Sequence, residues 1–193
     1  MSALQHIDQQ IFFFINHQCH IGFLNKLMPY WRSMYFWFPL YLFFITYLSM
    51  TYGKKALVFI LALAVTVTIS DTFSSKIVKP LVHRVRPCND VRIKDKVKLL
   101  VNPSSGYSFT SSHAANHFAV AVFLFFAFAP PRRWIGIILL IWAGTIAFGQ
   151  VYVGIHYPSD ILFGGLLGAS IGLISWILYR KYLEKHPEMQ FVL

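Results

Sequence analysis

Long apolar stretches separated by short polar segments make up most of the chain. Stretches that contain no Asp, Glu, Lys or Arg run over residues 33–53, 56–70, 99–131, 134–159 and 161–179. A helix needs about 20 mostly apolar residues to cross the hydrocarbon core of a bilayer. The second stretch is short, but polar residues up to Ser75 can extend it to the interface, and the third is long because its first part is polar. The pattern therefore predicts five membrane-spanning helices.

The N-terminal segment, residues 7–30, has a weaker apolar pattern. Its apolar residues 11–15 are flanked by Asp8 and Asn16, so an interfacial helix fits better than a sixth span. A secretory signal peptide carries positive charge before its apolar core, whereas the first charged residue here is Asp8. We expect one all-α integral membrane helix bundle over residues 1–193. It would have five to six transmembrane helices and, in residues 1–30, an N-terminal interfacial or first helix.

The composition supports a membrane protein and limits its function classes. Of 193 residues, 56% are hydrophobic and 12% are charged, and 17 Lys and Arg outnumber 7 Asp and Glu, for a formal net charge of +10. On a membrane protein, this surplus indicates an anionic lipid or phosphate as partner rather than nucleic acid. Two cysteines, Cys19 and Cys88, argue against a disulfide framework and a cysteine-rich metal site. No obligate protein partner is expected.

Residues suited to chemistry lie at span ends that share one side of the membrane. Because the chain alternates sides, these residues can converge: Lys79, Arg86, His113, His156 and Asp160. Short loops and the tail on the other side carry seven cations: Lys54, Lys55, Arg132, Arg133, Arg180, Lys181 and Lys185. The positive-inside rule makes that side cytoplasmic. The other ten of the 17 cations oppose this orientation, although Lys79 and Arg86 among them are candidate site residues.

The first cluster of chemical residues pairs a lysine with an arginine beside a membrane interface. Lys79 and Arg86 stand seven positions apart. Arginine offers a planar fork of donors to two phosphate oxygens, and lysine adds a compact charge, so the pair suits a phosphate dianion. The alternative is an anchor for anionic lipid headgroups.

The second cluster is a hydroxyl-rich loop that turns into an apolar helix at Ser111, Ser112 and His113. A helix N-terminus binds anions through its free N–H groups, although N-capping alone would explain the serines. His113 and His117 are four positions apart and could hold zinc, but the segment lacks the glutamate of a zinc-protease helix and a third ligand.

The third cluster joins a histidine and an aspartate four positions apart across a predicted helix start. Pro158 suits the first turn of that helix. Asp160 would then receive the Nδ1 proton of His156 and leave Nε2 with an oriented lone pair, which makes the histidine a nucleophile. A lone interfacial histidine is more often structural, so the interpretation of His156 as a nucleophile depends on its pairing with Asp160.

These clusters, in this order, resemble the type 2 phosphatidic acid phosphatase family of membrane enzymes, whose fold is related to that of vanadium haloperoxidases. The family pattern K-x6-R-P, P-S-G-H and S-R-x5-H-x3-D is similar to the chain over residues 79–165, the catalytic motif region. The resemblance implies that His156 attacks phosphorus, Asp160 orients His156, and His113 protonates the leaving oxygen. It also implies phosphate ligands at Lys79, Arg86, Ser111, backbone N–H groups of Ser112 and His113, and position 150. It implies neither a metal nor a cofactor.

Two positions depart from the family pattern. Ser112 replaces a glycine, and Gly149-Gln150 replaces Ser-Arg, which removes a charged phosphate ligand. Losing one charge-assisted hydrogen bond costs about 1.5–3 kcal/mol, or roughly one to two decades in rate. Arg84 or a cation of residues 92–98 would have to substitute; if none does, Gln150→Arg should raise turnover.

Two hypotheses of function follow. The first is a lipid phosphate phosphatase of the bacterial inner membrane with its active site facing the periplasm. Its substrate would be phosphatidylglycerol phosphate, polyprenyl pyrophosphate or a lipid A phosphate. The second is a lipid-phosphate binding or transport protein of the same fold that Gln150 has weakened as a catalyst. Haloperoxidase chemistry is disfavoured because those relatives are generally soluble.

Overall fold

The computed structural model describes residues 3–128 and 130–190, and no strand occurs among them. The all-α prediction is therefore confirmed for the described residues. The α-helices are α1 (Ala3–Phe13), α2 (Gly22–Trp31), α3 (Met34–Tyr52), α4 (Lys54–Thr72), α5 (Lys79–Val82), α6 (Ser112–Ala127), α7 (Arg133–Tyr152) and α8 (Pro158–Lys185). Short helical turns, Phe73–Val78 among them, connect several of these helices.

Among the described residues, four helical segments are long and apolar enough to cross a membrane. They are Met34–Tyr52, Lys54–Val82, Pro130–Tyr152 and Pro158–Lys185. The chain is thus a multi-pass membrane protein. The third predicted span corresponds to α6, whose 16 residues reach about 24 Å, less than the hydrocarbon thickness of about 30 Å. The polar first part of stretch 99–131 forms a loop instead, and five spans stay a prediction.

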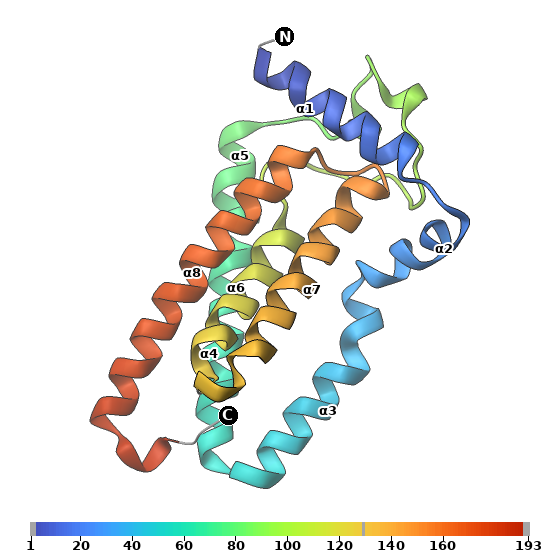
Figure 1. Ribbon diagram of the computed structural model, residues 1–193. Helices are drawn as coiled ribbons and strands as arrows, with labels where there is room; N and C mark the ends of the chain where they lie inside the picture. Colours follow the sequence, from blue (N-terminus) through green and yellow to red (C-terminus); the bar gives the residue numbers. More distant parts are fainter. Residues whose placement is uncertain (1–2, 129, 191–193) are drawn as a thin grey trace.

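Helix α6 lies inside the bundle, between α4, α7 and α8 (Figure 1). A ridge of glycines on α8 allows it to approach α6 closely. A Cβ at Gly164, Gly168 or Gly172 would lie 2.6, 1.9 or 2.3 Å from a backbone oxygen of Ser111, Ala115 or Ala119. Small residues at such spacing let membrane helices pack backbone to backbone. This contact fixes the start of α6 beside the start of α8.

The N-terminal helices are too short to be spans. Helix α1 lies across one end of the bundle, near the start of α8 (Figure 1). Asn16, which is fully buried, donates to the carbonyl oxygens of Tyr152 and Lys98, at 3.0 and 2.9 Å. These polar contacts attach the N-terminal segment to the end of α7, where the chemical residues gather. The interfacial position of this segment stays a prediction.

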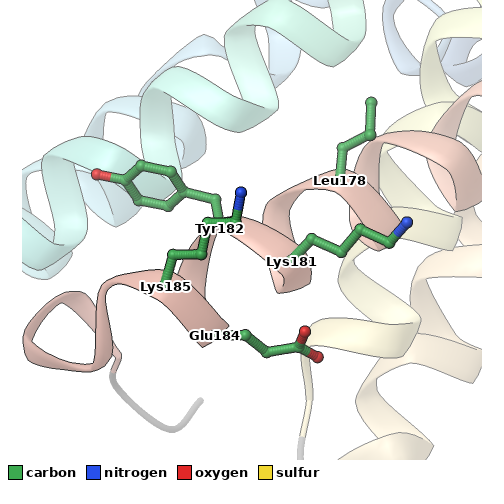
Figure 2. A pocket seen from close by; sticks show the side chains of 5 residues that line it. All are labelled: Leu178, Lys181, Tyr182, Glu184 and Lys185. Carbon is green, nitrogen blue, oxygen red and sulfur yellow. The ribbon is translucent and has the colours of Figure 1, made fainter.

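The opposite end of the bundle carries the cations assigned to the cytoplasmic side. A pocket at the C-terminal part of α8 is lined by Leu178, Lys181, Tyr182, Glu184 and Lys185 (Figure 2). Asp160 lies in the first turn of the same helix, so this pocket and the candidate chemistry occupy opposite ends of α8.

Candidate active site

A turn between α7 and α8 holds His156, and Asp160 follows in the first turn of α8. His156 Nδ1 lies 3.3 Å from Asp160 Oδ2, and both side chains are buried, with exposures of 2% and 0%. Nδ1 therefore donates to the carboxylate, and Nε2 keeps its lone pair. The spacing of the two residues predicted this contact.

The Nε2 atom of His156 faces Arg86. Arg86 Nη1 lies 2.9 Å from Nε2 and also donates to the carbonyl oxygen of Ile155 at 3.2 Å. Burial lowers the pKa of His156 to about 4, although Asp160 acts in the opposite direction. Burial also lowers the pKa of Arg86 from its ordinary value. At neutral pH the site thus holds a neutral imidazole against a guanidinium.

The carboxylate of Asp160 accepts several further hydrogen bonds. Its Oδ2 accepts from the Ser108 hydroxyl and, at 2.8 Å, from the Tyr157 N–H, while Oδ1 accepts from Arg84 Nη1 at 2.7 Å. Arg84 also pairs with Asp8 of α1. Ser108, Arg84 and Asp8 were not predicted in these roles, since no motif or spacing connects them with Asp160. Together they fix the carboxylate against His156.

The start of α6 places the second motif beside this network. The Ser111 hydroxyl accepts from the Ala114 N–H at 3.4 Å, which confirms the N-capping interpretation, and the Ser111 N–H donates to the Asp160 carbonyl at 3.0 Å. The Ser112 hydroxyl lies 2.9 Å from that of Ser74 on the α4–α5 segment. The α6 N-terminus and its free N–H groups thus lie at the same end of the bundle as His156.

His113 and Lys79 complete the predicted set. His113, in the first turn of α6, is close enough to His156 and Lys79 to interact electrostatically with both. Lys79 follows the π-helical turn Phe73–Val78 and is similarly close to Arg86 and Asp160. The structure therefore brings together all five residues that span alternation predicted to converge.

Gln150 lies in the last turn of α7 and is fully buried. Its Oε1 accepts a hydrogen bond from Arg32 Nε at 3.0 Å, and its Nε2 has no hydrogen-bond partner among the described residues. Two of the cations predicted to substitute for the family arginine pair with carboxylates. Arg84 binds Asp8 and Asp160, and Arg92 is 65% exposed and pairs with Asp90 at 2.7 Å. The arginine that contacts Gln150 is instead Arg32, at the end of α2, and substitution by Arg84 or by a cation of residues 92–98 stays a prediction.

The zinc alternative lacks support from geometry. The rings of His113 and His117 are stacked with centroids 6.4 Å apart, and His117 Nδ1 lies 2.7 Å from the His113 carbonyl oxygen. In residues 3–128 and 130–190, no three His, Cys, Asp or Glu side chains are placed to hold a metal. The metal-free mechanism stays a prediction.

Comparisons with known proteins give the family context. A family model described as the PAP2 superfamily matches residues 53–184. A lipid A 4'-phosphatase of Bacteroides thetaiotaomicron is 33% identical over 179 residues, which cover 91% of this chain and 77% of that protein. An undecaprenyl-diphosphatase of Sulfolobus acidocaldarius is 28% identical over 172 residues, 86% of this chain and 75% of that protein.

Solved structures share the fold. The crystal structure of Aquifex aeolicus LpxE has a TM-score of 0.64 and 25% identity, over 88% of this chain and 94% of that one. A transmembrane PAP2 type phosphatidylglycerolphosphate phosphatase from Bacillus subtilis has a TM-score of 0.67 and 24% identity, over 96% of this chain and 88% of that one. The predicted resemblance and the prediction of a phosphoric ester hydrolase are confirmed. With its motifs gathered at one end of a membrane helix bundle and the family model matched over residues 53–184, this chain belongs to the PAP2 superfamily.

Proposed function

We propose that the chain hydrolyses a phosphomonoester or pyrophosphate of a lipid through a phosphohistidine on His156. The observation that carries the proposal is the buried His156, whose Nδ1 donates to Asp160 while Nε2 faces the guanidinium of Arg86. A phosphate that approaches Nε2 meets that guanidinium, so Arg86 can transfer its hydrogen bond from Nε2 to a phosphate oxygen. The lone pair then faces phosphorus.

The reaction has two steps. His156 Nε2 forms a bond to phosphorus while the bond from phosphorus to the bridging oxygen of the lipid breaks, and His113 gives that oxygen a proton. Water then attacks phosphorus and gives a proton to His113 as the N–P bond breaks, which releases inorganic phosphate. Asp160 keeps its hydrogen bond to Nδ1 in both steps and stabilises the positive charge on the ring. Lys79, Arg86 and the N–H groups of Ser112 and His113 stabilise the charge on the phosphoryl oxygens.

The substrate and the membrane side follow from separate arguments. The similarity to a lipid A 4'-phosphatase extends over 91% of the chain, so phosphorylated lipid A is the first substrate to test. The cations at the end of the bundle opposite His156 favour a bacterial inner membrane protein whose site faces the periplasm.

The test is phosphate release by detergent-purified protein from lipid A, undecaprenyl diphosphate, phosphatidylglycerol phosphate and a short-chain phosphatidate. His156→Ala should abolish release. His83→Asn, at an exposed histidine with φ 53° that asparagine tolerates, is the matched control and should retain it. Equal release by wild type and His156→Ala would contradict the proposal. Binding of a lipid phosphate without turnover in the wild type would favour the binding-protein hypothesis.

The intermediate can be trapped. An aryl phosphate has a leaving group that needs no proton, so His113→Ala should still form the phosphoenzyme but hydrolyse it slowly. Intact mass spectrometry after a rapid quench should then detect a phosphorylated protein in His113→Ala and none in His113→Ala/His156→Ala. Rapid turnover by His113→Ala would contradict its assigned role in the second step.

A further inference from the structure

Arg32 ends α2 and lies outside the three motifs, yet its side chain reaches the end of α7. Its Nε donates to Gln150 Oε1 at 3.0 Å. Among the described residues, the guanidinium of Arg32 makes this one hydrogen bond and no ion pair. Both Nη groups are therefore available to a ligand.

Arg32 is close enough to Arg86 and to His113 to interact electrostatically with each. Burial and the charge of Arg86 lower the pKa of Arg32 to about 10, so it keeps its proton at neutral pH. Arg86 has no carboxylate within ion-pair distance among the described residues either. Two partly or fully buried guanidinium groups that lack acidic partners and lie near each other are costly unless an anion binds between them.

Both residues of the Gly149-Gln150 pair, which stands where the family has Ser-Arg, lie against Arg32. A Cβ at Gly149 would touch the Cβ of Arg32 at 3.4 Å, so glycine leaves this face of α7 open to the arginine. Gln150 accepts from Arg32 through Oε1, and its buried Nε2 remains an unused donor. An arginine at position 150 would instead put two like charges together.

We propose that Arg32 supplies the positive charge that the family arginine usually contributes, and that it binds a phosphoryl oxygen of the substrate through its Nη groups while Gln150 holds it in place. The free amide of Gln150 is a second, neutral donor to the same phosphate. This inference rests on the proposed phosphatase function and adds a phosphate ligand to that site.

The test compares Arg32→Gln with Arg92→Gln, a matched control at an exposed arginine on the same side of the membrane. Kinetics of phosphate release and the inhibition constant of inorganic phosphate are measured for each, with thermal unfolding as a check of the fold. Arg32→Gln should lower kcat/KM and weaken phosphate inhibition by about 10- to 100-fold. Arg92→Gln should change neither. Equal behaviour of the two variants would overturn the proposal.

Exchanging the two residues separates phosphate binding from packing. Gln150→Arg alone should lower activity, whereas Arg32→Gln/Gln150→Arg returns a single arginine to the site and should regain much of the loss. A loss in Arg32→Gln that the double variant does not regain would overturn the proposal. If Arg32→Gln does not fold, Arg32→Lys keeps the charge and should retain phosphate inhibition; loss of that inhibition in folded protein is contrary evidence. His156→Ala reports separately on the phosphatase function, because full activity of that variant refutes the mechanism itself.

Discussion

Replacing Asp160 with asparagine should lower kcat by about 10⁴-fold, as the same replacement does in the Ser–His–Asp triad, where the aspartate holds the histidine in its working tautomer. Asparagine has the same shape but offers one acceptor oxygen and one NH₂ group in place of two oxygens. Asp160 Oδ2 accepts from three donors, which are the Ser108 hydroxyl, the Tyr157 N–H and His156 Nδ1. Oδ1 accepts from Arg84.

Neither orientation of the new amide reproduces this arrangement. If the NH₂ group takes the Oδ2 position, it donates to His156 Nδ1, the ring proton moves to Nε2, and the nucleophilic lone pair is lost. If it takes the Oδ1 position, it opposes the Arg84 guanidinium at the 2.7 Å of the present contact. In this second case Nδ1 still has an acceptor, but the negative charge that stabilises the imidazolium is absent.

The fold should survive this substitution, because Arg84 keeps its ion pair with Asp8. The assay is kcat for phosphate release in detergent, with thermal unfolding of the same samples. Asp90→Asn is the matched control: that carboxylate is also buried and paired with an arginine, Arg92, but lies outside the site. A folded Asp160→Asn protein that keeps more than about a tenth of wild-type kcat would refute the assigned role of Asp160.

Three further predictions concern the same elements. Burial disfavours the charged form of His156, so its pKa of about 4 means that the ring stays neutral as pH falls from 7 to 5 and gains a proton only near 4. Titration of ¹⁵N histidine shifts, with His156→Ala to assign the signal, checks this; an inflection near 6.5 would contradict it. Gly168→Ala places a Cβ 1.9 Å from the Ala115 carbonyl oxygen and should destabilise the α6–α8 contact by about 1–3 kcal/mol. A Cβ at Gly144 would have no neighbouring atom within 4 Å, so Gly144→Ala should not destabilise the protein. Equal midpoints of thermal unfolding for the two variants would refute the packing argument. EDTA should leave phosphate release unchanged if the histidine mechanism operates, and loss of activity that a divalent metal restores would contradict it.

Local features of the sequence predicted much of the fold and of the site. Apolar runs predicted the long helices, because a span needs a continuous apolar stretch. The four-residue spacing across Pro158 predicted the contact between His156 and Asp160, because a chain that turns into a helix at Pro158 brings the residue before the turn close to the first helical turn. Alternation of the spans placed Lys79 and His113 at the same end. Each inference used only neighbours in sequence or the order of spans.

The contacts that position these residues could not be predicted in that way. Arg84 and Asp160 are 76 positions apart, Ser108 and Asp160 are 52 apart, and Arg32 and Gln150 are 118 apart. Such pairs depend on how the helices pack, and any of several cations could have reached the site. The start of α6 at Ser112, by contrast, agrees with the predicted turn from a hydroxyl-rich loop to an apolar helix.

The N-terminal segment contributes side chains to the site. The family model matches residues 53–184, so Asp8 and Arg32 both lie outside it, yet each binds a residue of a motif or its immediate neighbour. Asp8 accepts from the Ser159 hydroxyl at 2.6 Å and pairs with Arg84, which also binds Asp160. The carboxylates of Asp8 and Asp160 thus both pair with Arg84 and not with Arg86 or Arg32. The positive charges of Arg86 and Arg32 therefore stay available to a phosphate. The N-terminal segment therefore has two roles in the proposed site. Through Asp8 and Arg84 it orients the Asp160 carboxylate, and through Arg32 it supplies the positive charge that Gln150 lacks.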